Sequence, residues 1–195
     1  DHIGFGNSST PEDFSYTMEE QAQIIEKLLS ILPQWKIHIV AHSMGVAIAL
    51  FLEVQTYSRV LSFSNIEGNL ISEDCGILSR GISDMPYEEY KNKVYKQHLF
   101  VFRSNDQLHF DKSSPLSIHK TAVSLVEKSD SGELLERFKK LNCKKSYFYG
   151  EKNQDMPVLN KLDSIQKYVI QNSGHGMTTE NPKAFYTKLV EFVDS

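Results

Sequence analysis

A serine set between small residues, in the segment Ala41-His42-Ser43-Met44-Gly45, constrains the fold of this chain more than any other feature. The run from Lys36 to Ala41 predicts a buried strand, and Gly45 to Gln55 predicts an apolar helix. A serine on such a sharp strand-to-helix turn has strained backbone angles, so small residues must flank it. Its hydroxyl then projects above the sheet edge, and the N–H of Met44 points at a developing oxyanion. The segment predicts that Ser43 is a nucleophile.

Strand and helix patterns alternate along much of the remaining chain. Thr17 and Glu20 form a predicted capping box at the start of a helix that Pro33 ends. Three further strands and a closing helix are predicted at Val60 to Ile66, Lys145 to Tyr149, Gln166 to Ile170 and Pro182 to Val193. This alternation predicts an α/β fold with a mostly parallel sheet and helices on both faces.

The middle of the chain, residues 70–141, has helical patterns and no good strand. We therefore predict a partial α/β core from residues 1–69 and 142–195, with residues 70–141 inserted as a helical subdomain. The insert is rich in aromatic residues, which suit either an apolar pocket or simple packing. These residues are Tyr87, Tyr90, Tyr95, Phe100, Phe102 and Phe110.

Composition narrows the classes of partner. The chain has 195 residues, which suits one domain with an appendage at roughly 150 residues per domain. Its formal net charge of −4 gives no reason to expect nucleic acid or an anionic membrane surface. No apolar run approaches the roughly 18 residues of a membrane span, and Cys75 and Cys143 favour a reduced, cytoplasmic chain. We expect a small-molecule substrate as the partner, while the oligomeric state stays open.

Several motifs resemble the α/β-hydrolase family in its own order along the chain. Ser43 stands at the family's nucleophile position, with Ala41 replacing the usual first glycine. The segment from Asp1 to Ser8 resembles the Asp-x-x-Gly-x-Gly-x-Ser loop after the family's fourth strand. Ser173-Gly174-His175-Gly176-Met177 resembles the loop that carries its catalytic histidine. The resemblance implies an α/β-hydrolase fold with a helical cap, and it implies that the first strands are missing from this chain.

His175 is the best candidate for a general base, because it alone of seven histidines lies in a glycine-rich loop just after a strand. His42 is expected to pack near Ser43, and His38 to be a satisfied residue on a strand face. No pair of residues has the spacing of a metal site, so no metal or organic cofactor is implied. We expect ordinary roles for the histidines of the insert, His98, His109 and His119.

The acid that would complete a triad is open between two carboxylates. The family's usual position, three residues after Gly150, holds Asn153, which cannot be an anion but could orient the histidine ring. Asp155 follows in the same loop, and Glu67 ends the strand from Val60 to Ile66. We favour Glu67, because a carboxylate that closes a buried strand needs a partner, which His175 would supply.

These residues predict a serine hydrolase of an ester or related acyl bond in a small, apolar substrate, with Ser43, His175 and Glu67 as the triad and Met44 in the oxyanion hole. Thioesters, lactones and carbon–carbon bonds stay open as targets. The alternative is a hydrolase-like protein that binds without turnover, which Asn153 favours. If the first strands are missing, the strand before Ser43 would lie at an apolar edge, and we expect the 195 residues alone to be poorly soluble and nearly inactive.

Overall fold

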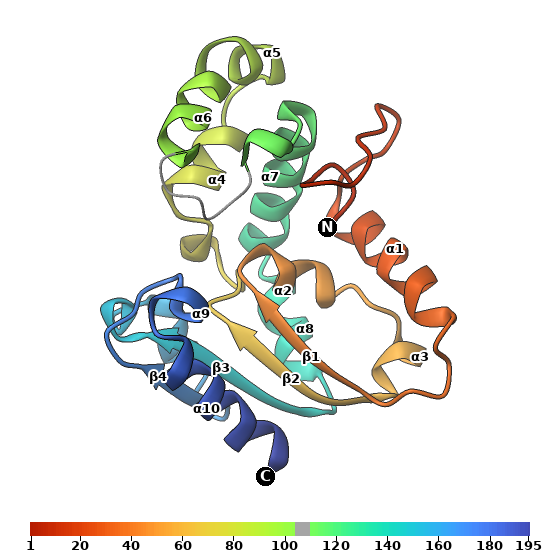
Figure 1. The fold of residues 1–195 in the computed structure, drawn as a ribbon, viewed down its shortest axis with the longest axis vertical. Coiled ribbons are helices and arrows are strands. Elements are labelled where there is room, and N and C mark those ends of the chain that lie inside the picture. Colours follow the sequence, from red (N-terminus) through yellow and green to blue (C-terminus); the bar gives the residue numbers. More distant parts are fainter. Residues whose placement is uncertain (104–109) are drawn as a thin grey trace.

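The computed structural model describes residues 1–103 and 110–195, and it contains a sheet flanked by helices with further helices rising from one side (Figure 1). In chain order the elements are α1 (Met18–Ser30), β1 (Ile37–His42), α2 (Met44–Ala49), α3 (Val54–Tyr57), β2 (Val60–Ile66), α4 (Gly76–Ser83), α5 (Tyr87–Glu89), α6 (Tyr95–Arg103), α7 (Pro115–Asp130), α8 (Glu133–Lys140), β3 (Lys144–Gly150), β4 (Gln166–Ile170), α9 (Met177–Glu180) and α10 (Pro182–Asp194).

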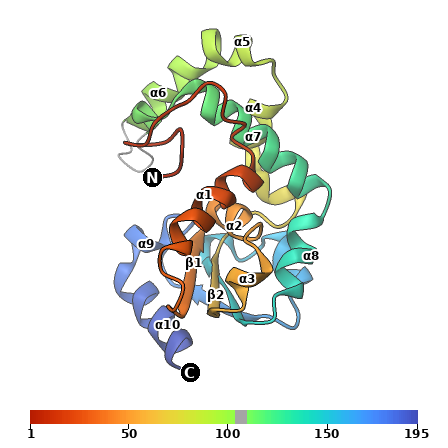
Figure 2. The ribbon, with the colours of Figure 1, turned by 90° about the vertical axis from the view of Figure 1, so that its right-hand side faces the viewer.

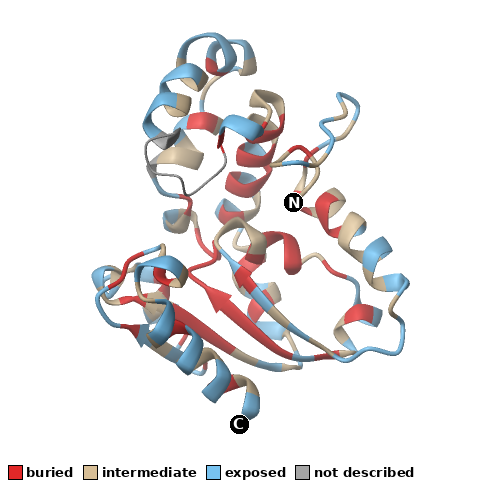
Figure 3. Ribbon diagram, in the orientation of Figure 1, coloured by how far each residue is buried: buried red, intermediate tan, exposed pale blue. Residues whose placement is uncertain are grey.

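The sheet is parallel throughout, and in the described part of the chain its strands follow the order β1-β2-β3-β4. All the predicted strands are present to within a residue or two, which confirms the predicted α/β class. β1 pairs with β2 alone among the described strands, and it is more exposed than β2, which is buried along most of its length (Figure 3). The expected poor solubility of the chain stays a prediction.

Helices cover both faces of the sheet, and each face has its own apolar core (Figure 2). On one face, helices α1, α2, α7 and α8 pack with the strands, and Phe63 of β2 meets Phe138 of α8 edge to face at 5.8 Å. On the other face, α9 and α10 pack on Phe148 of β3, which contacts Phe185 and Phe192. Both faces of the sheet therefore bury apolar side chains. The central strands also bury small polar ones, namely Ser62 and Ser64 of β2 and Ser146 of β3.

The start of α1 follows the predicted cap in part. Thr17 accepts a hydrogen bond from the Glu20 N–H at 3.2 Å, as expected for an N-cap. The Glu20 carboxylate, however, accepts from the N–H of Ser15 and not from that of Thr17, so the predicted reciprocal bond is wrong. The Thr17 N–H donates to the Ser15 hydroxyl instead, at 3.3 Å.

The helix predicted from Gly45 to Gln55 is interrupted, which corrects the sequence-based expectation. It forms two helices, α2 and α3, with a break after Ala49. The Glu26 carboxylate of α1 accepts from the N–H of Glu53 at 2.7 Å, and the Tyr57 hydroxyl donates to the Ala49 carbonyl at 2.7 Å. These tertiary contacts satisfy backbone and helix-end groups that an uninterrupted helix would have satisfied internally.

Helix α7 is joined to the N-terminal segment along one face. Ser117 donates to the Gly4 carbonyl at 2.7 Å, and Thr121 donates to the Tyr16 carbonyl at 3.2 Å. One turn further on, the Ser124 hydroxyl accepts from the Met18 N–H. The helical spacing of these residues places them on one face, so the polar stripe fixes α7 against the loop that precedes α1.

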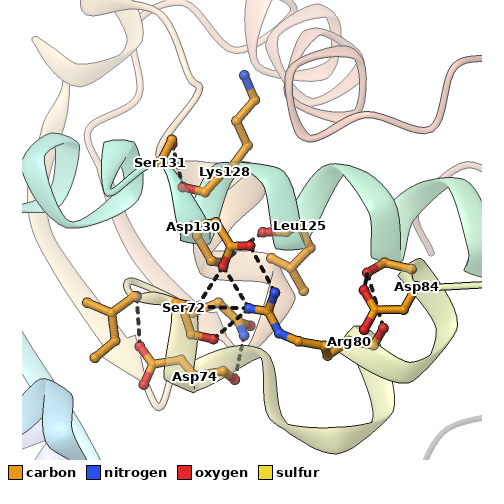
Figure 4. A network of polar contacts seen from close by, with 12 residues as sticks. Ser72, Asp74, Arg80, Asp84, Leu125, Lys128, Asp130 and Ser131 are labelled. Atoms are coloured by element: carbon orange, nitrogen blue, oxygen red, sulfur yellow. Dashed lines mark hydrogen bonds and ion pairs between the residues drawn. The ribbon is translucent and has the colours of Figure 1, made fainter.

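Helix α4 is tied to α7 by a polar network at its base (Figure 4). Arg80 of α4 donates to both carboxylate oxygens of Asp130 on α7, at 2.8 and 2.7 Å. The Ser72 hydroxyl donates to the same carboxylate at 2.6 Å. The planar guanidinium matches the two carboxylate oxygens, so this ion pair holds α4 against the C-terminal end of α7.

The helices above the sheet have a small core of their own, in which Tyr90, Tyr95 and Phe110 pack together. Phe100 is exposed, and the side chain of Phe102 lies outside the described part of the chain, as does His109. Leu125 of α7 and Phe138 of α8 belong to the larger core that α1, α2, α7 and α8 form with the strands. The division into a core and a cap at residues 70–141 stays a prediction.

None of the described helices combines the length and the apolar character that crossing a membrane requires. Cys75 and Cys143 are both free thiols.

Candidate active site

Ser43 lies on the turn that joins β1 to α2, with φ 53° and ψ −128°. This positive φ is strained for a residue with a side chain, and strain of this kind concentrates at functional sites. The Ser43 N–H donates to the Ile66 carbonyl at the end of β2, which holds the turn against the neighbouring strand. The next N–H, that of Met44, is the first of α2 and has no acceptor within its own helix.

Glu67 and His175 meet across the ends of the strands. Oε2 of Glu67 accepts a hydrogen bond from Nδ1 of His175 at 2.8 Å. The Glu67 side chain is 1% exposed, whereas the His175 side chain is 53% exposed. Glu67 also has a positive φ, 39°, immediately after β2. A buried carboxylate therefore orients an imidazole whose other nitrogen can face solvent.

Two further donors hold the Glu67 carboxylate. The N–H of Gly150 donates to Oε1 at 2.8 Å, and the Asn153 amide Nδ2 lies 3.0 and 2.9 Å from the two oxygens. Burial raises the pKa of Glu67, but the hydrogen bonds from His175, Gly150 and Asn153 outweigh it, so its pKa lies below the ordinary value. Asn153 thus contacts the carboxylate, which replaces our expectation that it could orient the ring.

The loop that carries His175 packs directly on the end of β3. A Cβ atom at Gly150 would lie 2.5 Å from the carbonyl oxygens of Ser173 and Gly174, so a glycine is required at this close approach. The Lys152 N–H also donates to the Ser173 carbonyl at 3.0 Å. This packing brings the histidine loop beside Glu67.

Glu180 holds the same loop from the other side, and sequence reasoning missed it. Its carboxylate accepts from the N–H groups of Gly174 and Gly176, at 3.0 and 3.2 Å, and from Lys152 Nζ at 3.0 Å. The bonds from Lys152 and the two backbone groups hold the pKa of Glu180 below its ordinary value. Because Gly174 and Gly176 flank His175, Glu180 fixes the backbone on both sides of the ring. A carboxylate only four and six residues after two loop glycines could have indicated that Glu180 accepts from their N–H groups.

His42 packs on His175, a contact that the sequence analysis did not predict. The two ring centroids lie 4.5 Å apart, and Nε2 of His42 lies 2.9 Å from the His175 carbonyl oxygen, to which it can donate. Burial and the neighbouring His175 lower the pKa of His42, which favours a neutral ring. His38, by contrast, bonds Ser62 across the sheet at 2.7 Å, as expected of a satisfied strand residue.

The structure does not bring every candidate into contact. Asp155, the alternative acid, is exposed, and in the described part of the chain no hydrogen bond or ion pair joins it to His175. The Ser43 hydroxyl likewise makes no hydrogen bond to another described residue. Such contacts are often long before substrate binds. No three His, Cys, Asp or Glu side chains within residues 1–103 and 110–195 gather as a metal site.

Comparisons of sequence identify the kind of fold. Residues 1–78 match the family model described as alpha/beta hydrolase fold. A stretch of 67 residues is 43% identical to the probable lysophospholipase BODYGUARD 2 of Arabidopsis thaliana, covering 33% of this chain and 14% of that protein. The probable lysophospholipase BODYGUARD 1 of the same plant is 40% identical over 67 residues, with the same two coverages. The matched stretch is therefore a small part of each relative's length.

Solved structures match the chain over its whole length. An esterase from Exiguobacterium antarcticum gives a TM-score of 0.72 at 18% identity, and 80% of that chain is covered. A bromoperoxidase from Bacillus anthracis gives 0.77 at 16% identity, again with 80% of that chain covered. At these identities the likeness concerns the fold alone. Together with the family model and the parallel sheet, it identifies the chain as a protein of the α/β-hydrolase fold.

Proposed function

We propose that the protein is a serine hydrolase that cleaves an ester, or a related acyl bond, of a small and fairly apolar substrate. The observation that carries the proposal is the bond from Nδ1 of His175 to Glu67, next to a serine on a strained strand-to-helix turn. In this proposal Ser43 is the nucleophile, His175 the general base, and Glu67 the acid that orients it.

The chemistry follows from the tautomer that Glu67 favours. With its proton on Nδ1, a neutral His175 ring has a free lone pair on Nε2 and can take the proton of the Ser43 hydroxyl. The Ser43 oxygen then bonds to the carbonyl carbon, and the N–H of Met44 donates to the developing oxyanion. His175 returns the proton to the leaving alcohol, and water repeats the sequence to release the acid. No step needs a metal or an organic cofactor.

The known relatives favour an ester-type bond. The similar plant sequences are described as probable lysophospholipases, and one similar structure is an esterase. A further similar structure is an N-acyl homoserine lactone degrading enzyme, which keeps lactones among the substrates to test. We propose that the helical residues 70–141 act as a cap that shapes the acyl pocket. A panel of short-chain and long-chain esters, thioesters and lactones would separate these substrate classes.

Labelling with a fluorophosphonate tests the nucleophile directly, because the reagent forms a covalent bond to an activated serine oxygen. We expect one adduct on Ser43 of the protein expressed in full length. The Ser43→Ala variant should lose the label, whereas Ser58→Ala, which removes an exposed serine hydroxyl at the end of α3, should keep it. Equal labelling of the wild-type and Ser43→Ala proteins would refute the proposal.

The rival function is binding without turnover. Asn153 was the feature that favoured it, since an amide stands where the family usually has its acid. The bond between Glu67 and His175 supports the hydrolase over this alternative, because a carboxylate at the end of another strand contacts the ring. Turnover of chromogenic short-chain esters distinguishes the two functions.

A further inference from the structure

Asn153 contacts Glu67, the acid of the proposed triad, and cannot itself be an acid. It lies in the short 3-10 turn Glu151–Asn153 that follows β3. Its Nδ2 group donates toward both oxygens of Glu67, at 3.0 and 2.9 Å. With Gly150 N–H on Oε1 and His175 on Oε2, the carboxylate is held by donors on each oxygen. Its rotation about the last side-chain bond would break all of these bonds.

The Asn153 amide is neutral, so it donates to the Glu67 carboxylate without adding a charge beside it. The titratable groups that act on Glu67 are His175, His42 at the end of β1, Asp74 and Tyr147. The charges of Asp74 and Glu67 already repel each other. Another negative charge at residue 153 would add to the repulsion that Glu67 experiences. An amide supplies hydrogen bonds without any charge.

We propose that Asn153 is a positioning residue that holds the Glu67 carboxylate with Oε2 facing Nδ1 of His175. The inference rests on the proposed triad, and it assigns to Asn153 no contact with the substrate. The amide acts through Glu67, which in turn selects the tautomer of His175 that leaves Nε2 free to accept a proton.

The isosteric variant Asn153→Asp gives a test with a distinctive pH dependence. At low pH the new carboxyl group is protonated and can still donate to Glu67. The neighbouring Glu67 carboxylate raises the pKa of this second carboxyl group. When the pH rises above that pKa, the new group ionises, can no longer donate, and repels Glu67. We expect kcat of the variant to approach the wild-type value at the acidic end and to fall about tenfold or more as the pH rises toward about 8. The matched control Gln154→Glu adds the same charge at the exposed neighbouring residue and should keep the wild-type profile.

Removal of the amide gives a second, simpler result. Asn153→Ala should lower kcat about tenfold at every pH, without the new alkaline decline, and should leave KM within about twofold of wild type. Gln154→Ala should change neither quantity. Thermal melts followed by circular dichroism verify that all four variants are folded.

The tautomer of His175 provides a readout that does not need turnover. Ring ¹⁵N shifts of His175, measured by NMR in the Ser43→Ala background, should show the Nδ1–H form in the parent and a larger Nε2–H fraction after Asn153→Ala. Wild-type kinetics and an unchanged tautomer in the Asn153 variants would overturn the inference and leave the proposed function standing. A changed tautomer in a protein that hydrolyses no ester would support the positioning role and reject the proposed function.

Discussion

Glu67 accepts a hydrogen bond from His175 at 2.8 Å, although 108 positions separate the two residues along the chain. Strand pairing produces this contact. Ile66 at the end of β2 pairs with Phe148 of β3, and Gly150 at the end of β3 pairs with Ile170 of β4. The segments that follow β2 and β4 therefore emerge at the same edge of the sheet, on either side of β3.

Replacement of Glu67 should affect activity far more than replacement of Asp155. Glu67→Gln keeps the size of the side chain but removes the charge that offsets an imidazolium, so we expect kcat to fall on the order of a hundredfold or more. Asp155→Asn removes an exposed carboxylate and should leave kcat within about twofold. Steady-state kinetics on the same ester measures both, and the reverse ranking would make Asp155 the acid.

Gly150→Ala should displace the histidine loop. The added methyl group would lie 2.5 Å from two carbonyl oxygens, while φ at Gly150 is −76°, which alanine adopts freely. We expect loss of stability and a fall in kcat of about tenfold or more. Gly81→Ala is the matched control, because its Cβ would enter open space on helix α4, and it should stabilise the protein by roughly 0.5–1 kcal/mol. Thermal melts and kcat report both; a Gly150→Ala protein with wild-type activity would contradict the close approach.

Loss of the Glu180 carboxylate should loosen the backbone around His175. Glu180→Gln keeps one oxygen to accept a bond, but it can no longer accept well from both loop N–H groups and Lys152 together. We expect faster hydrogen exchange at Gly174 and Gly176 and a several-fold lower kcat. Glu191→Gln, which removes an exposed carboxylate paired with Lys188 on α10, serves as control. Unchanged exchange at the two glycines would rule out the clamp.

Asp74 should make stability depend on pH between about 4 and 7. Burial raises the pKa of Asp74 from 3.8 to about 6, assisted by the charges of Glu73 and Glu67 and opposed by bonds from the N–H groups of Leu70 and Ile71. The folded state therefore binds more protons than the unfolded state in this range, and the free energy of unfolding falls as the pH rises. A shift of about two pKa units corresponds to a loss of about 3 kcal/mol.

Denaturant unfolding at several pH values checks this dependence. Asp74→Asn should flatten the decline, since an amide does not titrate, whereas Asp155→Asn should keep the wild-type slope. Glu67, whose pKa is lowered, acts oppositely and below about pH 4.5: its stabilising contribution is lost as the pH falls through its folded pKa. An equal slope in the wild-type and Asp74→Asn proteins would show that Asp74 does not titrate in this range.

Local patterns predicted the parts of the site that depend on short segments. The small residues around Ser43 predicted the strained turn, because crowding there depends on immediate neighbours. The glycine-rich segment around His175 predicted a loop after a strand, which the structure confirms. The helix expected from Gly45 to Gln55 was wrong. At its break the N–H of Glu53 donates to the Glu26 carboxylate of α1, a partner 27 positions away that the local pattern could not indicate.

The sequence by itself therefore determined the strands, most helices, the turn at Ser43 and the loop of His175, since periodicity and side-chain size act over a few residues. Tertiary structure alone decided which carboxylate meets the imidazole. Glu67 and Asp155 stand in the same order relative to Ser43 and His175, so order could not separate them. The pairing of β2, β3 and β4 separates them, because it brings the Gly150 N–H and the Asn153 amide to Glu67 and leaves Asp155 in solvent.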